Sequence, residues 1–191
     1  MLNSFLNYLK SVSKKFAKEN NIFDIIIYGS SVKSKENPND TDFIIIFLNT
    51  KLEERSFIAQ EFKELIKDKI KYPDIKTANL SELFNSNFLA RQGILIEGYS
   101  LLSSVAFAEK LGFNGYSIFT YNLKNMNHNE KTKFTYSLIG RKNKGIIKLT
   151  NAEPLGKGAI AVPVEKSLIF EDFLKKWNIS YKERKSLISK K

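Results

Sequence analysis

Two short runs of apolar, β-branched residues constrain the fold of this chain more than any other feature. They are Asp24–Tyr28, with the sequence Asp-Ile-Ile-Ile-Tyr, and Asp42–Leu48, with the sequence Asp-Phe-Ile-Ile-Ile-Phe-Leu. Apolar runs without polar alternation are typical of strands that are buried on both faces. We therefore expect both runs to be strands in the interior of a sheet.

Helical periodicity surrounds these two runs. Apolar residues recur at three- and four-residue steps over residues 2–19, with lysines on the other side, so this segment predicts an amphipathic helix. Residues 51–71 give the clearest helix of the chain, and we expect Pro73 to close it. Asp74–Ala78 then predicts a third strand.

Three further predicted elements precede a change in the pattern of elements along the chain. The sequence predicts a helix over 81–92, a strand over 94–102 with Glu97-Gly98 inside it, and a helix over 105–111 that ends at Gly112. After this glycine the pattern of elements differs. We therefore expect two domains, residues 1–111 and residues 112–191.

The second part of the chain predicts alternating strands and helices. The expected strands are 116–121, 146–149, 159–164 and 180–188, and the expected helices are 129–139 and 167–177. Ser167 is a candidate N-cap of the last helix. The order β-α-β-β-α-β is the ferredoxin-like pattern, which RNA-recognition modules share with many unrelated domains. We therefore expect an α+β fold whose second domain is ferredoxin-like.

The positive charge of the chain is concentrated in this second part. The formal net charge is +11, but residues 1–111 hold 15 basic and 14 acidic side chains, whereas residues 112–191 hold 16 basic and 6 acidic ones. Such asymmetry favours a basic module beside a near-neutral one. A plainer interpretation, in which lysine usage serves solubility or follows genome composition, explains the total better than its uneven placement.

Composition excludes several classes of chemistry. The 191 residues include no Cys and a single His, His128, so disulfides, Cys-ligated zinc, iron–sulfur clusters and a thiol nucleophile are excluded. The apolar runs are too short to span a membrane, and the N-terminal segment lacks the cleavage pattern of a signal peptide. We expect a soluble, cytoplasmic protein without membrane partners.

The segment that joins the two apolar runs carries the chemistry. Side chains two apart on a strand point to the same face, so we expect Asp40 and Asp42 to lie side by side. Close carboxylates repel each other and favour a cation, and Mg²⁺ prefers oxygen ligands. Gly29 permits a tight turn, and Ser30 with nearby backbone N–H groups is suited to phosphate. The segment therefore predicts a metal–triphosphate site.

These residues resemble the Gly-Ser … Asp-x-Asp motif of the DNA polymerase β-like nucleotidyltransferase superfamily, especially its minimal archaeal and bacterial members. Gly29-Ser30 is followed by nine residues and then by Asp40-Thr41-Asp42, a spacing that suits the family. The later helix, followed by the Glu97-Gly98 turn, is also similar to the family pattern. The resemblance extends over roughly residues 20–105.

The resemblance implies a role for each residue of the motif. The implied nucleotide-binding residues are Gly29, Ser30, Ser31 and Lys33. The implied catalytic residues and metal ligands are Asp40, Asp42 and Asp74. The first two carboxylates would bridge two Mg²⁺ ions, and the third would complete the ion that activates the attacking hydroxyl. The reaction would transfer a nucleoside monophosphate from a nucleoside triphosphate and release pyrophosphate.

Plainer interpretations of the acidic residues stay open at this point. Asp40 could cap a turn, and Asp42 could pair with a lysine. Asp74 could be an ordinary carboxylate at the start of a strand. Lys33 and Lys35 stand where antitoxin-type members of the family often have an arginine-containing loop, which weakens that assignment.

The basic second domain suggests a nucleic-acid acceptor, since lysine and arginine bind phosphates without regard to sequence. The candidate contacts are Arg141, Lys142, Lys144, Lys182, Arg184 and Lys185. Tyr116 and Phe119 invite an RNA-stacking interpretation, but they lie on opposite faces of one strand, so core packing explains at least one of them better. RNA, tRNA-like, is the preferred acceptor.

We therefore predict a Mg²⁺-dependent nucleotidyltransferase that acts on RNA. One alternative is the same chemistry on a protein, as in antitoxin-type relatives that attach nucleotides to a toxin; the extra basic domain argues against it. Another is a nucleic-acid-binding module with a degenerate catalytic fold; the intact pair Asp40 and Asp42 argues against that.

Overall fold

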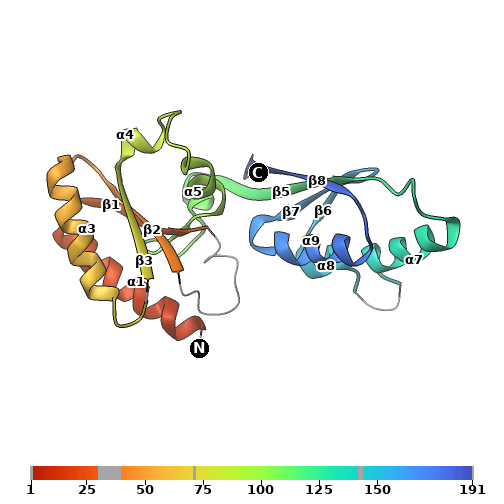
Figure 1. Cartoon of the computed structure of the whole chain (residues 1–191), viewed down its shortest axis with the longest axis horizontal. Helices are drawn as coiled ribbons and strands as arrows, with labels where there is room; N and C mark the ends of the chain where they lie inside the picture. The colour runs from red at the N-terminus through yellow and green to blue at the C-terminus, as the bar shows by residue number, and fades with distance from the viewer. Residues whose placement is uncertain (1, 30–39, 71, 142–143, 191) are drawn as a thin grey trace. The chain divides into compact units, whose positions relative to one another are not determined.

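The chain forms two compact units, Met1–Gly112 (unit 1) and Phe113–Lys191 (unit 2). The structure, a computed structural model, describes residues 2–29, 40–70, 72–141 and 144–190, with side chains described from residue 5 onward and not at residue 40 (Figure 1). Each unit has its own sheet and its own hydrophobic core. None of the described helices is both long enough and apolar enough to cross a membrane.

Unit 1 is built on a four-stranded sheet in the order β3-β2-β1-β4. Its strands are β1 (Ile22–Tyr28), β2 (Asp40–Phe47), β3 (Tyr72–Asn79) and β4 (Tyr99–Ser100). Its helices are α1 (Leu2–Glu19), α3 (Leu52–Ile66), α4 (Leu80–Leu83), α5 (Arg91–Glu97) and α6 (Phe107–Lys110). Strand β2 runs parallel to β3 and antiparallel to β1, and β4 pairs antiparallel with β1.

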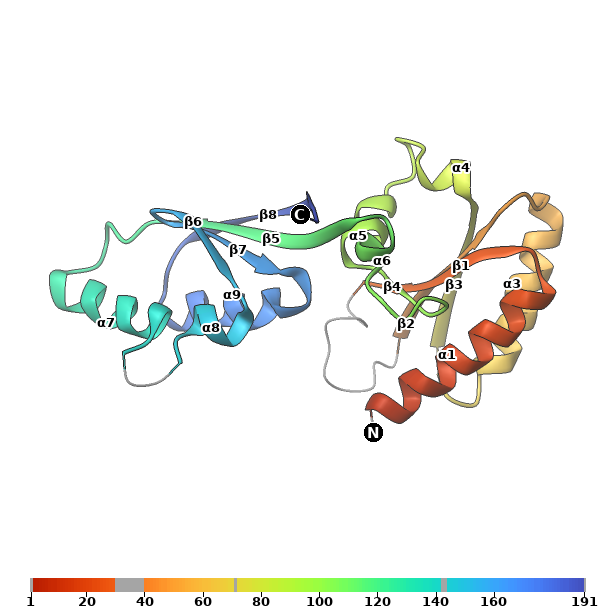
Figure 2. The ribbon, with the colours of Figure 1, turned by 180° about the vertical axis from the view of Figure 1, so that it is seen from behind.

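Apolar cores cover both faces of this sheet. Ile25 and Ile45 belong to a core that includes residues of α1 and α3. Ile26 and Ile44, one position along each strand, belong to a second core that includes residues of α4, α5 and α6. Figures 1 and 2 show α1 and α3 on one side of the strands and α5 and α6 on the other. The prediction of strands buried on both faces is thus confirmed, because successive side chains alternate between two apolar layers.

Three predicted elements of unit 1 differ from the structure. Helix α3 ends at Ile66, and Pro73 lies inside β3, where an edge strand tolerates the missing N–H. The helix predicted over 81–92 is only the single turn of α4, and α5 begins at Arg91.

The segment predicted as a strand over 94–102 begins as the end of α5, which runs to Glu97, and only Tyr99 and Ser100 form the strand β4. Gly98 ends α5 by donating its backbone N–H to the carbonyl of Ile94 at 3.0 Å. A Cβ at Gly98 would lie 2.3 Å from that same carbonyl oxygen, so the sharp turn requires glycine. The apolar run was ambiguous because a few residues show no clear period.

Unit 2 is built on an antiparallel four-stranded sheet in the order β6-β7-β5-β8. Its strands are β5 (Phe113–Tyr121), β6 (Glu153–Gly156), β7 (Ala159–Pro163) and β8 (Tyr181–Ser189). Its helices are α7 (His128–Ile139), α8 (Ile146–Thr150), the 3₁₀ turn η1 (Val164–Lys166) and α9 (Ser167–Lys176). Helices α7, α8 and α9 lie on one side of this sheet in both views (Figures 1 and 2).

An aromatic cluster fills the core of unit 2. Phe134 contacts Trp177 edge-to-face, with ring centroids 5.6 Å apart, and Tyr121 at 5.7 Å. Phe170 packs on Phe119 at 5.2 Å and thereby joins α9 to the central strand. Trp177, the only tryptophan of the chain, is partly buried and packs against the core of this unit.

Two predictions for unit 2 were wrong. The run Ile146–Leu149 is not a strand but belongs to α8, and the strand at this point in the order is β6. Gly145 stands at the N-cap of α8, where a Cβ would lie 2.3 Å from the backbone of Ile139. Ser167 does not cap α9, because Lys166 occupies the N-cap position; the Ser167 hydroxyl donates instead to the carbonyl of Val164 at 2.8 Å.

Candidate functional site

Three polar side chains form a row across the central strands of unit 1. The register pairs Tyr28 of β1 with Asp42 of β2, and Asp42 with Asp74 of β3. Directly paired residues project to the same face, about 5 Å apart in the direction across the strands. Tyr28 belongs to the core on the face of α4, α5 and α6, so the two carboxylates lie on that face too. We call Tyr28, Asp42 and Asp74 the acidic row.

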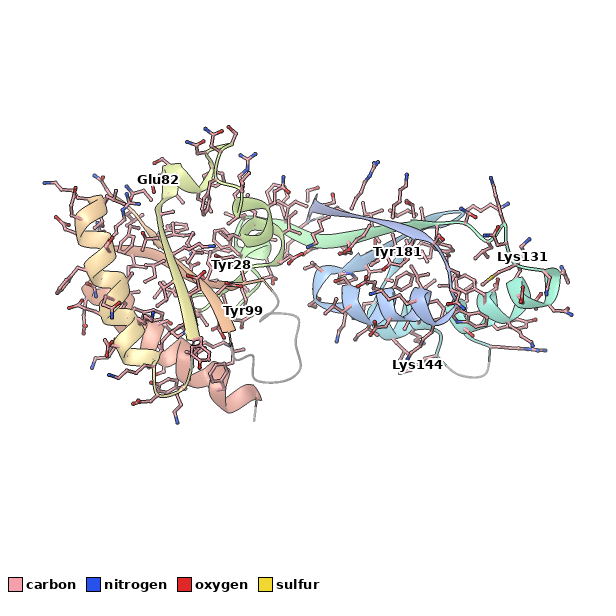
Figure 3. All side chains as sticks on the ribbon, in the orientation of Figure 1. Tyr28, Glu82, Tyr99, Lys131, Lys144 and Tyr181 are labelled. Atoms are coloured by element: carbon pink, nitrogen blue, oxygen red, sulfur yellow. The ribbon has the colours of Figure 1, made fainter. Side chains whose placement is uncertain are left out.

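The row stands where the apolar strands end. Tyr28, labelled in Figure 3, is the last residue of β1, and it belongs to the same core as Ile26 and Ile44 of the next row. The Asp42 side chain is half-buried, and that of Asp74 is 60% exposed. Carboxylates at this position keep access to solvent while their strands stay fixed by the packing behind them.

Gly29 brings the backbone against the acidic row. Its φ is +77°, a conformation that side chains disfavour. A Cβ at this position would lie 2.6 Å from Oδ2 of Asp42, which is closer than atoms can approach. The positive φ favours glycine here, and a larger residue would force the Asp42 carboxylate to shift, so the turn after β1 lies close against this side chain. This is the role that the sequence predicted for Gly29 in the tight turn.

Other predicted site residues lie partly or wholly outside the described residues. Ser30, Ser31 and Lys33 are outside them altogether. The backbone of Asp40 begins β2 and pairs with Tyr72, but its side chain is not described. Within the described residues, no three His, Cys, Asp or Glu side chains form a group that could hold a metal ion.

Lys76 joins the site although the sequence did not single it out. It follows Asp74 by two residues on β3, and its Nζ lies 3.8 Å from Oδ2 of Asp74 and 5.9 Å from the centroid of the Tyr28 ring. The Tyr28 hydroxyl, and more weakly Asp74 and Asp42, raise the pKa of Lys76, so its ammonium stays charged at neutral pH. Burial raises the pKa of Tyr28. The two-residue spacing from Asp74 was the signal that could have identified this lysine.

The donor set of the row suits a hard divalent cation. Asp42 and Asp74 offer carboxylate oxygens in paired positions on adjacent strands, and oxygen is the ligand that Mg²⁺ prefers. The Lys76 ammonium lies 3.8 Å from Oδ2 of Asp74 and balances part of this negative charge. Asp74, the predicted third acid, is thus placed beside Asp42 by the parallel pairing of β2 with β3.

A buried ionic network supports the strand that ends in the row. Asp24 of β1 is fully buried and accepts hydrogen bonds from the Ser100 hydroxyl at 2.8 and 2.9 Å and from Lys110 Nζ at 2.8 Å. The Lys110 ammonium also lies 4.3 Å from the centroid of the Phe23 ring. The network ties β1 to β4 and α6, and the sequence alone did not reveal it because its members come from three distant segments.

A second ion pair ties α3 to α4. The guanidinium of Arg55, which is buried, donates to both carboxylate oxygens of Glu82 at 2.6 and 3.0 Å. Glu82 also accepts the backbone N–H of Asn79 in a capping box (Figure 3). These hydrogen bonds, the one from Arg55 first, lower the pKa of Glu82. The pair fixes the segment that follows β3.

The basic residues of unit 2 fall into separate places. Arg141 and Lys144 lie between α7 and α8, and the Arg141 guanidinium is 5.0 Å from the centroid of the Tyr136 ring. Lys142 lies outside the described residues. Lys182, Arg184 and Lys185 are exposed on β8, but alternation of side chains puts Lys185 on the opposite face from the other two. The six predicted contacts therefore do not form one surface.

Comparison with known protein families gives one match, in the segment that contains the acidic row. The family model described as polymerase beta, nucleotidyltransferase, matches residues 10–98. That segment holds β1, β2, β3 and the whole acidic row, and it is slightly less than half of the chain. The match supports a nucleotidyltransferase domain of the polymerase beta type in unit 1. No curated protein matches the chain.

Solved structures show only a distant likeness. A crystal structure of a toxin–antitoxin with AMP-PNP is 17% identical, with a TM-score of 0.37, and the match covers 48% of this chain and 71% of that one. A crystal structure of the toxin–antitoxin MntA-HepT is 15% identical, with a TM-score of 0.34, and the match covers 49% of this chain and 69% of that one.

Proposed function

We propose that this protein is a Mg²⁺-dependent nucleotidyltransferase that transfers a nucleoside monophosphate from a nucleoside triphosphate to an RNA acceptor. The observation that carries the proposal is the pairing of Asp42 with Asp74 beside Gly29, inside the segment that matches the nucleotidyltransferase model. Paired carboxylates on adjacent strands, next to a tight glycine turn, are the arrangement that a metal–triphosphate site needs.

Each residue of the site has a task in this reaction. Asp42 and Asp74, together with Asp40, which precedes Asp42 by two residues, would hold two Mg²⁺ ions. When bound, such ions neutralise the triphosphate and stabilise the attacking and leaving oxygens. Gly29 lets the turn approach the Asp42 carboxylate, and Ser30, Ser31 and Lys33 follow it in the chain as the phosphate-binding residues.

The reaction balances without a further co-reactant. The acceptor hydroxyl gives its proton to solvent water, its oxygen forms a bond to the α-phosphorus, the bond from that phosphorus to the bridging oxygen of the β-phosphate breaks, and pyrophosphate leaves. The protonated Lys76 ammonium near Asp74 is placed to attract the negatively charged substrate into this corner.

Unit 2 would supply the acceptor site. Its sheet order β6-β7-β5-β8, the hairpin of β6 with β7 and the helices on one face support a ferredoxin-like domain, and α8 is the addition to that pattern. We place the two domains at residues 1–111 and 112–191. The excess of 16 basic over 6 acidic side chains in the second supports binding of a polyanion.

The test is to incubate the protein with α-labelled nucleoside triphosphates, Mg²⁺, and either total RNA or cell protein. We expect label on RNA that disappears in Asp40→Ala/Asp42→Ala and in Asp74→Ala. Glu61→Ala is the matched control, because Glu61 is an exposed acid of α3, which packs on the other face of the sheet. Carboxylate-dependent label on protein would favour the antitoxin-type alternative, and no carboxylate-dependent label would refute nucleotidyl transfer.

A further inference from the structure

The sheet of unit 2 has one face that its helices do not cover. Phe119 and Tyr121 of β5 pack in the core with α7 and α9, together with Ile160 of β7. The residues between them therefore point to the opposite face, since side chains alternate along a strand. Among the described residues of unit 2, no helix contributes to a core on that face.

The register defines what this uncovered face presents. Ile118 stands between Ala161 of β7 and Arg184 of β8. Thr120 stands between Ala159 and Lys182. Lys182 and Arg184 thus line the outer strand β8, while β7 contributes two alanines, of which Ala161 is fully buried beneath its neighbours. We call Tyr116, Ile118, Thr120, Lys182 and Arg184 the open face.

Tyr116 is the aromatic member of the open face. It pairs with Pro163 on one side and Ser186 on the other, and its ring is partly exposed. Its hydroxyl donates to Glu153 Oε1 of β6 at 3.3 Å, which restrains the ring toward the edge far from β8. An aromatic ring is thereby held on a flat surface whose opposite border is cationic.

This arrangement matches the chemistry of single-stranded RNA. Unstacked bases bind to aromatic and apolar surfaces on exposed sheets, while their phosphates need cations to one side. Tyr116 and Ile118 offer the first, and Lys182 and Arg184 the second. In a duplex the faces of the bases are stacked inside, so its phosphates would contact Lys182 and Arg184 but its bases would not stack on the Tyr116 ring.

We propose that the open face binds a single-stranded segment of the acceptor RNA. This inference rests on the proposed RNA acceptor and narrows it to one surface. The loop residues Arg141 and Lys144 are not part of that surface, because α7 and α8, which flank them, pack on the covered face. Lys185 is not part of it either, because it pairs with Ser117, which is buried on the covered side and hydrogen-bonds Glu183.

The adjacent pair Arg184 and Lys185 provides a matched test. Both are exposed and carry the same charge on the same strand, but they project to opposite faces. We would measure the anisotropy of a short fluorescein-labelled single-stranded RNA with the full chain. Arg184→Gln should weaken binding roughly tenfold and reduce the slope of log affinity against log salt by about 0.7, whereas Lys185→Gln should leave both within about twofold of the wild type.

A second pair tests the aromatic contact. Tyr116→Leu should lower the affinity for the single-stranded RNA roughly tenfold. It should leave the affinity for a duplex that contains the same strand unchanged. Arg141→Gln is the control for the loop. Equal losses in Arg184→Gln, Lys185→Gln and Arg141→Gln would overturn the proposal, as would absence of RNA binding by the wild type or tighter binding of the duplex. Circular dichroism of each variant would exclude unfolding as the cause.

Failure of this inference is distinguishable from failure of the proposed function. Glu61→Ala, the control variant in α3 of unit 1, should bind RNA as tightly as the wild type. If RNA is labelled but Arg184→Gln and Lys185→Gln bind it equally, transfer stands and the open face is wrong. If Arg184→Gln alone weakens binding but no RNA is labelled, the surface stands and the transfer reaction is wrong.

Discussion

The two sheets of this protein differ in how many of their faces are covered. The sheet of unit 1 has an apolar core on each face, whereas that of unit 2 has a core on one face. In unit 1, polar side chains in the two central strands are therefore pushed to the strand ends, where the acidic row lies, apart from Asp24 with its buried partners. In unit 2, alternate side chains along whole strands remain available for contacts. A sheet with a core on each face leaves room for polar groups only at its strand ends, whereas a sheet with a core on one face can present polar groups over the whole of the other face.

The difference is visible in the sequences of the central strands. Strand β1 has Ile at three successive positions, but β5 alternates buried Ser117 and Phe119 with the partly exposed Tyr116 and Ile118. The charge follows the same division, with a near-neutral unit 1 and a strongly basic unit 2. A rigid carboxylate site needs fixed strands, whereas a polyanion needs a broad cationic surface.

The strongest challenge to this comparison is Asp24, a charge inside the doubly covered sheet. Asp24→Ala should lower the free energy of unfolding by about 3–5 kcal/mol, because it leaves Lys110 and the Ser100 hydroxyl without their buried acceptor. Urea denaturation followed by circular dichroism would measure the loss. Asp68→Ala, an exposed acid of the same unit, is the control; an equal effect of both variants would show that the network contributes nothing.

An isoleucine from each sheet compares the two kinds of coverage directly. Ile44→Ala should lower the free energy of unfolding by about 2–5 kcal/mol, because Ile44 is fully buried in β2. Ile118→Ala should cost about 1 kcal/mol or less, because Ile118 is half-buried on the open face. Denaturation of both variants under one set of conditions gives the difference. Similar losses would mean that the open face is part of a core.

Two glycines separate backbone strain from the fit to the acidic row. Gly29→Ala and Gly112→Ala both place a side chain at positive φ, +77° and +83°, so each should lose about 1–2 kcal/mol of stability. Only Gly29→Ala should also reduce nucleotidyl transfer, because its Cβ would meet Asp42, whereas a Cβ at Gly112 has no atom within 4 Å. Transfer rates under conditions where both variants are folded decide the point. Equal transfer rates of Gly29→Ala and Gly112→Ala would show that the turn at Gly29 does not contribute to the site.

The smallest expected effect concerns pH. The folded-state pKa of Glu82 is lowered, so its contribution to stability is complete above the ordinary pKa of a glutamate and is lost as the pH falls toward the folded-state value. Unfolding measured between about pH 5 and 3 should therefore lose stability less steeply in Glu82→Gln than in the wild type. The exposed Glu54→Gln should behave like the wild type. An identical pH dependence of all three proteins would contradict the role of the Arg55–Glu82 pair.

The sequence predicted the strands that carry the site better than the segments around them. Ile25 to Ile27 and Phe43 to Phe47 were recognisable because a strand between two apolar layers needs no polar position. The run Ile94–Glu97 was misassigned because a short apolar segment can be a buried helix or a buried strand. Its true state depends on the turn at Gly98, where only glycine fits, and that contact is set by tertiary structure.

The motif singled out Asp42 and Asp74 as candidate site residues, but it did not point to Lys76, which lies beside them. Asp42 and Asp74 come together because β2 and β3 pair in parallel. Asp74 was singled out through the family resemblance, which places a third carboxylate on a strand after the long helix, and not through a predicted pairing. Lys76 was overlooked because lysine on a strand is usually solvated. The open face was missed because the register that pairs Tyr116 with Pro163 and Ile118 with Arg184 is set by tertiary structure and cannot be read from the sequence of each strand alone.

The parallel pairing of β2 with β3 also has a consequence for the order of folding. Asp42 and Asp74 meet only after the chain has closed the long connection through α3, a slower event than forming the antiparallel pair of β1 and β2. The closing step brings two negative charges together, and their repulsion opposes it, in part offset by Lys76, whose Nζ lies 3.8 Å from Oδ2 of Asp74. Under the proposed function, a divalent ion held by Asp42 and Asp74 would offset this repulsion further, so that it would stabilise folded unit 1 as well as take part in catalysis.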